Sequence, residues 1–434
     1  MRANGPVTGR KGLRSMFEFG KDLRKIFAQA RESDDLSWLE LIGVDLVEVE
    51  ARQQAIDAGR VSCRHPFEAS LRASALWREH ARRRGATASL DRAAAAVDEA
   101  RARANGHQGI EAHMEAVRID MLRFDLCGGP DLLERALGVI ADLGRPRREQ
   151  DASAAAALHA RLSARQARLS GDPAALLDAA ALLDAALHGL QSAPADHVED
   201  VRLDRAALAL EAGVVRRDPR LLDQAGRDLT ALVEGASPDY RPLTRARALA
   251  LCGAGLCALA TIAEDEAARL QGQALFDAAV DQFTPDHSPL DWVAIQILQA
   301  GDPRTPQKAL AQAETLTAGG GLILGALARD ACAEQRVREA EDQGDLAALA
   351  AIAARVRLRL QTEDAAKAPL DWAADQIALA RVGRAVERLS GHAPPGVALA
   401  LAEAAAIAGE LGAPTLARRA EALMTPVGIS RPGR

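Results

Sequence analysis

The sequence is punctuated by a short turn that recurs about every 43 residues, and each turn is followed by a run rich in Ala and Leu. The turns are Gly-Gly-Pro-Asp at 128–131, Gly-Asp-Pro at 171–173, Arg-Asp-Pro at 217–219, Gly-Asp-Pro at 301–303 and Gly-Asp at 344–345. Gly and Pro are tolerated between helices far better than inside them. The pattern therefore predicts stacked helical hairpins, because one hairpin cannot bury its apolar face alone.

The same turns give the number of hairpins. Apolar stripes at helical spacing predict that the second helices begin near residues 87, 130, 172, 218, 264, 302, 345 and 395. Several first helices open with Pro in the first turn and a carboxylate after it, as at His65-Pro66, Ser288-Pro289 and Ala368-Pro369, and we expect Ser288 to act as an N-cap. No segment alternates with a period of two. We therefore expect an all-α fold, a right-handed α-solenoid of about eight hairpins.

Composition agrees with helix-on-helix packing and argues against nucleic acid as a partner. Apolar residues make up 48% of the chain but aromatic residues only 3%, so the core must consist of Ala, Leu, Val and Ile. The net charge is −6, whereas a nucleic-acid-binding protein usually carries a basic surface. We interpret the local basic run Arg82–Arg84 as a solvated helix end.

The cysteine pattern and the hydropathy of the sequence predict the cellular compartment of the protein. The five cysteines include no Cys-x-x-Cys pair, which fits free thiols in a reducing cytoplasm, and no signal-peptide pattern begins the chain. The longest uncharged stretch, 248–263, is shorter than the roughly 20 residues of a membrane helix. We therefore expect a cytoplasmic protein without an integral membrane segment, in which 248–263 is a helix buried on all sides.

The N-terminal region has its own organisation. We expect a disordered tail over 1–12, helices over 13–60, the repeat array over 61–424 and a second disordered tail over 425–434. Residues 13–31 are amphipathic and contain three of the seven Phe residues, including Phe17 and Phe19. Two interpretations stay open for this helix: a cap on the first hairpin, or a docking helix for a partner or a membrane surface.

Two segments resemble a known family. Residues 272–292 read GQALFDAAVDQFTPDHSPLDW, and 349–372 read LAAIAARVRLRLQTEDAAKAPLDW. Both are similar to the long bacterial variant of the tetratricopeptide repeat, with its P-L-D-W cap and a Gln four residues later, here Gln296 and Gln376. The Asn-Asn-Leu-Gly that follows in that family is absent. The resemblance implies a superhelix with a concave groove that binds peptides or proteins, and it implies no catalytic residues.

Catalytic and metal-binding patterns are not apparent in the sequence. His107 and His113 are six residues apart and lie on different helix faces, and no Glu-x-x-His pair occurs. Gly319–Gly321 is not a phosphate loop, because no Lys-Ser or Lys-Thr follows it. We expect no metal, no cofactor and no enzymatic activity.

The resulting functional hypothesis is a scaffold or adaptor that holds a protein or peptide partner in its groove. The residues we expect to contact the partner are polar positions of the first helices and aromatic positions of the N-terminal helix, namely Arg205, Arg247, Gln296, Gln376, Phe17 and Phe19. A module that senses a small ligand or peptide is the alternative, and an all-α enzyme is a third hypothesis.

Overall fold

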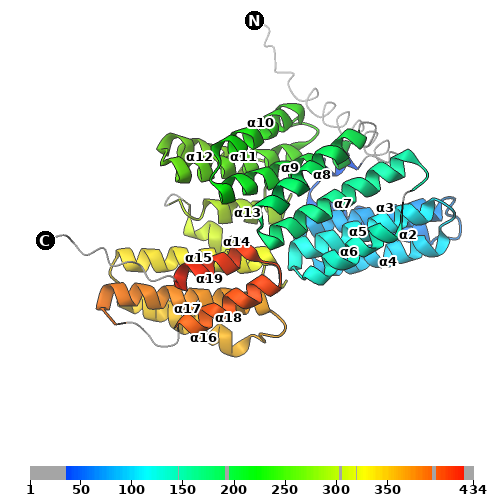
Figure 1. Cartoon of the computed structure of the whole chain (residues 1–434). Helices are drawn as coiled ribbons and strands as arrows, with labels where there is room; N and C mark the ends of the chain where they lie inside the picture. The colour runs from blue at the N-terminus through cyan, green and yellow to red at the C-terminus, as the bar shows by residue number, and fades with distance from the viewer. Residues whose placement is uncertain are drawn as a thin grey trace, which may run out of the picture.

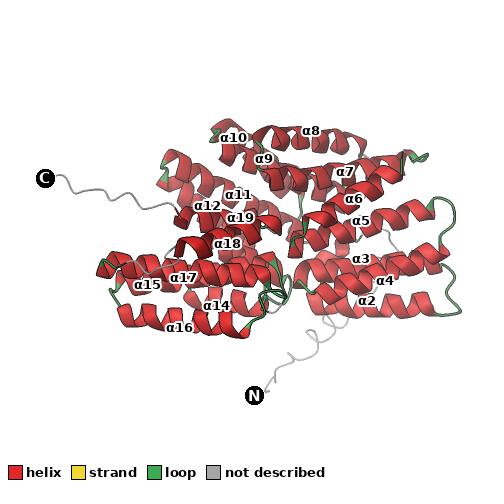
Figure 2. Ribbon diagram, turned by 60° about the horizontal axis from the view of Figure 1, so that its bottom comes forward, coloured by secondary structure: helices red, strands yellow, loops and turns green. Residues whose placement is uncertain are grey.

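The computed structural model describes residues 36–144, 146–190, 195–302, 305–318, 320–392 and 397–424. Eighteen α-helices and one 3-10 helix make up these parts of the chain, which contain no strand (Figure 1, Figure 2). The expectations for the tails 1–12 and 425–434, and for the amphipathic residues 13–31 with Phe17 and Phe19, lie outside the described residues.

The helices pair into eight consecutive hairpins, as the turns predict. The first helices are α3 (Pro66–Arg84), α5 (Gln108–Cys127), α7 (Glu149–Ser170), α9 (Ala195–Arg216), α11 (Pro242–Ala263), α13 (Pro289–Gln299), α15 (Ile323–Asp342) and α17 (Pro369–Ser390). The second helices are α4 (Thr87–Arg103), α6 (Pro130–Asp142), α8 (Pro173–Gly189), α10 (Pro219–Gly235), α12 (Glu266–Val280), α14 (Gln307–Leu316), α16 (Leu346–Thr362) and α18 (Val397–Glu410). The 3-10 helix η1 (Ser37–Leu41) and α2 (Val44–Gly59) precede them, and α19 (Pro414–Met424) follows. The fold is an all-α solenoid.

The recurring turn works by the same chemistry at four of the hairpins. Between the two helices one residue adopts the left-handed backbone, Gly at 171 and 344 but Arg217 and Glu264 at the other two. The next residue is always Asp, and its carboxylate accepts hydrogen bonds from amides of the second helix, as at Asp172, Asp218, Asp265 and Asp345. The turn therefore ends one helix and begins the next within two or three residues.

The sixth hairpin departs from this pattern. The Gly-Asp-Pro turn at 301–303 does not begin the second helix, which starts only at Gln307. Asp302 is buried and lies 3.7 Å from Arg269 instead of capping a helix. Ser288 does not cap α13 either, because its hydroxyl donates to Asp291 at 2.6 Å. Both expectations were wrong because the carboxylates bind side chains in place of amides.

The segment that precedes α2 is largely buried inside the array. The helical region expected over 13–60 is interrupted at Ile42 and Gly43, where the Val44 amide donates to the Asp286 carbonyl at 3.2 Å. Trp38 and Leu39 are buried before this break. After the break, α2 exposes its outward face, including Leu46, Val49 and Ile56.

The solenoid closes on itself. Helix α13 of hairpin 6 contacts α3 of hairpin 1, and α15 of hairpin 7 contacts α5 of hairpin 2. The Gly129 amide donates to the Leu411 carbonyl, which joins hairpin 2 to the end of hairpin 8. Hairpin 6 thus follows hairpin 1 by one complete turn of the superhelix, and the last hairpins lie beside the first ones (Figure 1). First helices therefore face an axis that is enclosed.

Helix α11 differs from its prediction. Most of its residues after Leu251 are half-buried, so the helix is not covered on all sides. It is long and apolar enough to cross a membrane by length and composition alone, which is also true of core helices in soluble proteins. Its backbone approaches α12 closely at two glycines, where a Cβ at Gly253 would lie 2.9 Å from the Gly272 carbonyl oxygen.

Candidate functional site

Ion pairs connect successive first helices on the inner side of the solenoid. Each pair joins residues roughly one repeat apart: Arg78–Glu115 at 2.7 Å, Asp125–Arg165 at 2.7 Å, Arg161–Asp204 at 2.6 Å, Arg247–Asp291 at 2.7 Å and Arg329–Asp375 at 3.1 Å. Arg is suited to such places because its planar guanidinium binds a carboxylate with two donors and keeps its charge when buried. This series of ion pairs fixes the rotation between neighbouring hairpins.

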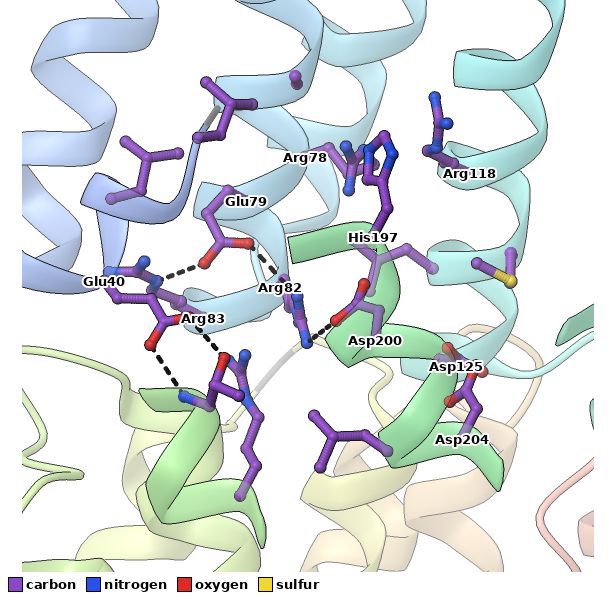
Figure 3. Close-up of a pocket in the computed structure, with 18 of the residues that line it drawn as sticks. Glu40, Arg78, Glu79, Arg82, Arg83, Arg118, Asp125, His197, Asp200 and Asp204 are labelled. Atoms are coloured by element: carbon purple, nitrogen blue, oxygen red, sulfur yellow. Dashed lines mark hydrogen bonds and ion pairs between the residues drawn. The ribbon is translucent and has the colours of Figure 1, made fainter. Parts of the chain in front are cut away.

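Two further contacts cross the axis. Arg82 of α3 donates to Asp200 of α9 at 3.1 Å (Figure 3). Glu40 of η1 accepts from the Thr244 amide at 2.9 Å and from Arg241 at 3.0 Å, both on or next to α11. The N-terminal 3-10 helix is therefore bound inside the first superhelical turn.

The basic run Arg82–Arg84 is not a solvated helix end, as the sequence suggested. Arg83 is fully buried and donates to Glu79 at 2.6 Å and to the Ile42 carbonyl at 2.9 Å. Only Arg84 is exposed. The prediction was wrong because the end of α3 points at the axis, which η1 closes.

Two neighbouring cavities lie along this axis. The inner cavity has a volume of about 170 Å³ and is lined mainly by arginines and carboxylates of α3, α5, α7, α9 and α11. The outer cavity, of about 1250 Å³, lies between the N-terminal parts of α3, α5 and α7. Five residues line both and form what we call the neck: Leu36, Ala75, Arg78, Arg118 and His197. Figure 3 shows Arg78, Arg118 and His197 grouped together at this place.

The neck carries more positive than negative charge. Arg78 and Arg118 share one carboxylate, Glu115, at 2.7 and 3.3 Å. Burial alone would raise the pKa of Glu115, but the two guanidinium groups hold that pKa below its usual value. Burial lowers the pKa of Arg118, and the charges of Arg78 and Arg161 lower it further against the opposing effect of Glu115. An additional anion at the neck would therefore be stabilised.

Further from the axis, the carboxylates in the wall of the outer cavity lie among arginines, including Arg64, Arg72 and Arg148. Glu68, Glu111 and Asp151 form an acidic cluster in its wall. Burial raises the pKa of Glu111 and outweighs His107 and Arg148, which lower it, while the charges of Asp151 and Glu68 raise it further. Arg148 and His107 lie 3.8 and 3.9 Å from the Glu111 carboxylate. Asp151 is only 6% exposed, and its Oδ2 has no hydrogen-bond partner among the described atoms. A hydrogen-bond donor that reached this oxygen would be stabilised here.

One helix sets the distance between these two regions. Glu111, Glu115 and Arg118 follow one another on the same face of α5, at spacings of four and three residues. Seven residues of helix separate Glu111 from Arg118, which is about 10 Å along the axis. The outer cavity can therefore hold a ligand that carries a negative and a positive group at that separation.

The arginines predicted to contact a partner lie in different places. Arg247 lines the inner cavity and is paired with Asp291. Arg205 points the other way, since it donates to Asp184 of α8 at 3.0 Å and pairs with Asp228 of α10. Because both partners of Arg205 belong to second helices, the structure does not bring Arg205 to the cavities.

The predicted glutamines are also outside the cavities. Gln296 is buried on α13 and Gln376 is half-buried on α17, and neither lines the inner or the outer cavity. The P-L-D-W segments that contain Trp292 and Trp372 instead contribute to apolar clusters of the later hairpins.

Sequence reasoning missed the residues that build the neck and the acidic cluster. One signal was available, because charged residues in first helices recur with opposite sign roughly one repeat apart, as in Arg78 and Glu115. That offset indicates inward-facing pairs between neighbouring hairpins. Among the described residues, no group of three or more His, Cys, Asp or Glu side chains is arranged to hold a metal ion.

Comparisons with known proteins add little to these observations. No protein-family profile matches the chain, and no curated protein matches it. Among solved structures, the chain is similar to a circular tandem repeat protein with novel repeat topology and enhanced subunit contact surfaces, at 15% identity over 88% of this chain and 94% of that chain, with a TM-score of 0.23. A TM-score this low means that the two chains do not superpose as wholes, so the fold assignment rests on the hairpins themselves.

Proposed function

We propose that this helical repeat protein is a scaffold that binds a segment of a protein partner in the outer cavity. Its volume of about 1250 Å³ exceeds the roughly 300–1,000 Å³ of small-molecule sites, so it accommodates several residues of a peptide. Apolar side chains such as Phe67, Leu71 and Met114 in its wall would bury the partner's apolar residues.

The observation that carries the proposal is the sharing of Glu115 by Arg78 and Arg118. Since one carboxylate serves two half-buried guanidinium groups, the neck can bind a carboxylate of the partner in a bidentate manner. A basic residue of the partner would then lie at the acidic cluster, about 10 Å away. In an extended peptide this corresponds to a separation of about three residues.

The tetratricopeptide resemblance supports the same class of function. Proteins of that family use inner helix surfaces to hold peptides, and the outer cavity lies between inner helices α3, α5 and α7. This chain would differ from the open groove of that family by enclosing its axis with Arg82, Asp200 and η1. The partner segment would therefore enter from one end of the superhelix.

Selection from a random twelve-residue peptide library on the full chain tests the proposal. We expect enriched peptides to combine an acidic and a basic residue about three positions apart. Arg118→Gln should weaken the best peptide at least about tenfold in fluorescence anisotropy, because a buried charge-assisted pair is lost. Arg123→Gln is the matched control on α5, since Arg123 pairs with Asp91 outside both cavities. Failure to enrich peptides, or equal losses in both variants, would show that the neck is not the binding site.

A further inference from the structure

We infer that residues 13–31 of this chain are an internal ligand of the outer cavity, so that a partner must displace them. The described chain begins at Leu36, and Leu36 lines both cavities at the neck. Five residue steps from 36 to 31 span at most about 17 Å, so the amphipathic segment starts within reach of the acidic cluster. A tether this short gives millimolar effective concentration.

Charge complementarity favours the segment as occupant. Residues 13–31 contain five basic and two acidic side chains. The acidic cluster of Glu68, Glu111 and Asp151 includes a buried carboxylate oxygen without a hydrogen-bond partner. A Lys or Arg from the segment would supply the missing donor, which removes the cost of an unsatisfied buried acceptor.

The apolar parts also match. At helical spacing Phe17 and Phe27 share one face of the segment with Leu13, Met16 and Leu23, which gives that face a large apolar area. The outer cavity offers Phe67, Leu71, Met114, Ala154 and Leu190 in its wall. An amphipathic helix that lays its apolar face into a groove is a common mode of recognition, and it places charged residues at the edge.

The exposed outer face of α2 is the competing place for this segment. Leu46, Val49 and Ile56 lie there with more than half of their surface exposed. Glu48 on the same helix is already paired with Arg52 and Arg92, however, whereas Asp151 in the cavity has an oxygen without a partner. The basic face of 13–31 therefore gains more in the cavity.

Photo-cross-linking within the full chain distinguishes the two places. Phe17 and Phe27 are replaced, one at a time, by the photoreactive residue benzoylphenylalanine, and cross-linked peptides are identified by mass spectrometry. We expect cross-links within one chain to peptides from 66–72, 111–118 and 149–154. Cross-links only to α2, only to a second chain, or to no peptide would overturn the inference. Since no partner is added, the result does not depend on the proposed function.

A matched pair of variants tests the role of charge. Asp151→Asn should lower the yield of the cavity cross-links at least about threefold, because a buried charge-assisted hydrogen bond is lost. Glu234→Gln is the control, because Glu234 is an exposed residue of α10 outside both cavities. An unchanged yield in Asp151→Asn would contradict the proposed contact even if the cross-links reach the cavity.

Discussion

The Arg82 guanidinium of the first hairpin donates a 3.1 Å hydrogen bond to the Asp200 carboxylate of the fourth, across the axis of the solenoid. Both side chains are mostly buried, and Asp200 also lies 3.3 Å from Arg161. Residues 118 positions apart are thus joined directly. In most solenoids each repeat contacts only its neighbours, so this contact makes the first superhelical turn one cooperative unit.

Breaking this pair should destabilise the protein. We expect Arg82→Gln or Asp200→Asn to lower the free energy of unfolding by about 1.5–3 kcal/mol, because either change removes a mostly buried, charge-assisted hydrogen bond. The double variant should show a coupling energy of about 1–2 kcal/mol in urea unfolding. Additive effects would mean that the two residues act independently, and the axis would then be held by the remaining contacts.

Acid should weaken the same unit. Burial alone would raise the pKa of Asp200, but Arg82 and Arg161 hold it well below its usual range, and Arg165 and Arg161 do the same for Asp204. A carboxyl whose pKa is lower in the folded state stabilises the fold above its unfolded pKa of about 4, and this contribution is lost as pH falls below that value.

The measurement is the free energy of unfolding between about pH 7 and pH 3, and we expect a steep fall below about pH 4. Asp200→Asn should make that fall shallower. Asp178→Asn, at an exposed position of α8, is the control and should keep the steep dependence. If Asp200→Asn showed the same pH dependence of the free energy of unfolding as the wild type, Asp200 would not be a source of that dependence.

Trp292 should be a structural residue and not part of a binding surface. Its ring is 8% exposed and packs with Phe276 and Phe283 in the core of the fifth and sixth hairpins. Trp292→Ala should therefore cost about 3–5 kcal/mol in thermal or urea unfolding. Leu298→Ala on the same helix removes a side chain that is 47% exposed and should cost less than about 1 kcal/mol. If both variants lost a similar amount of unfolding free energy, Trp292 would not be a core residue.

Gly253 should be required for the close approach of α11 to α12. A Cβ at this position would lie 2.8 Å from Phe276 Cε1 and 2.9 Å from the Gly272 carbonyl oxygen, which is backbone. We expect Gly253→Ala to cost about 1–3 kcal/mol, because the helices must separate. Gly226→Ala in α10 meets no atom within 4 Å and should stabilise the protein by up to about 1 kcal/mol through helix propensity. We therefore expect the melting temperature to fall in Gly253→Ala and to rise in Gly226→Ala.

Much of the fold could be predicted because its signals are local. The turns and the apolar stripes act over a few residues, and they placed the second helices at 87 and 130 and within two residues at 172, 218, 264, 345 and 395. The prediction at 302 was wrong by five residues because Asp302 binds Arg269 instead. At this position a tertiary ion pair replaces the local helix cap.

The site could not be predicted in the same way. Arg205 and Arg247 look alike in sequence, since both lie on first helices, yet one pairs with the second helices α8 and α10 and the other lines the inner cavity. Which face of a first helix points inward depends on small rotations between hairpins, and these rotations accumulate along the array. The sequence of a single helix therefore does not reveal the total rotation between distant hairpins.

The eight hairpins, their turns and the Ala- and Leu-rich core follow from the order of the residues, because each depends on contacts within a helix or between neighbours. Long-range contacts in the folded chain, in contrast, close the solenoid after five hairpins, enclose Arg82 and Arg83, and make Arg78 and Arg118 share Glu115 at the neck. The physical reason is range: helix caps act over about four residues, whereas closure brings together side chains that are 118 positions apart and more.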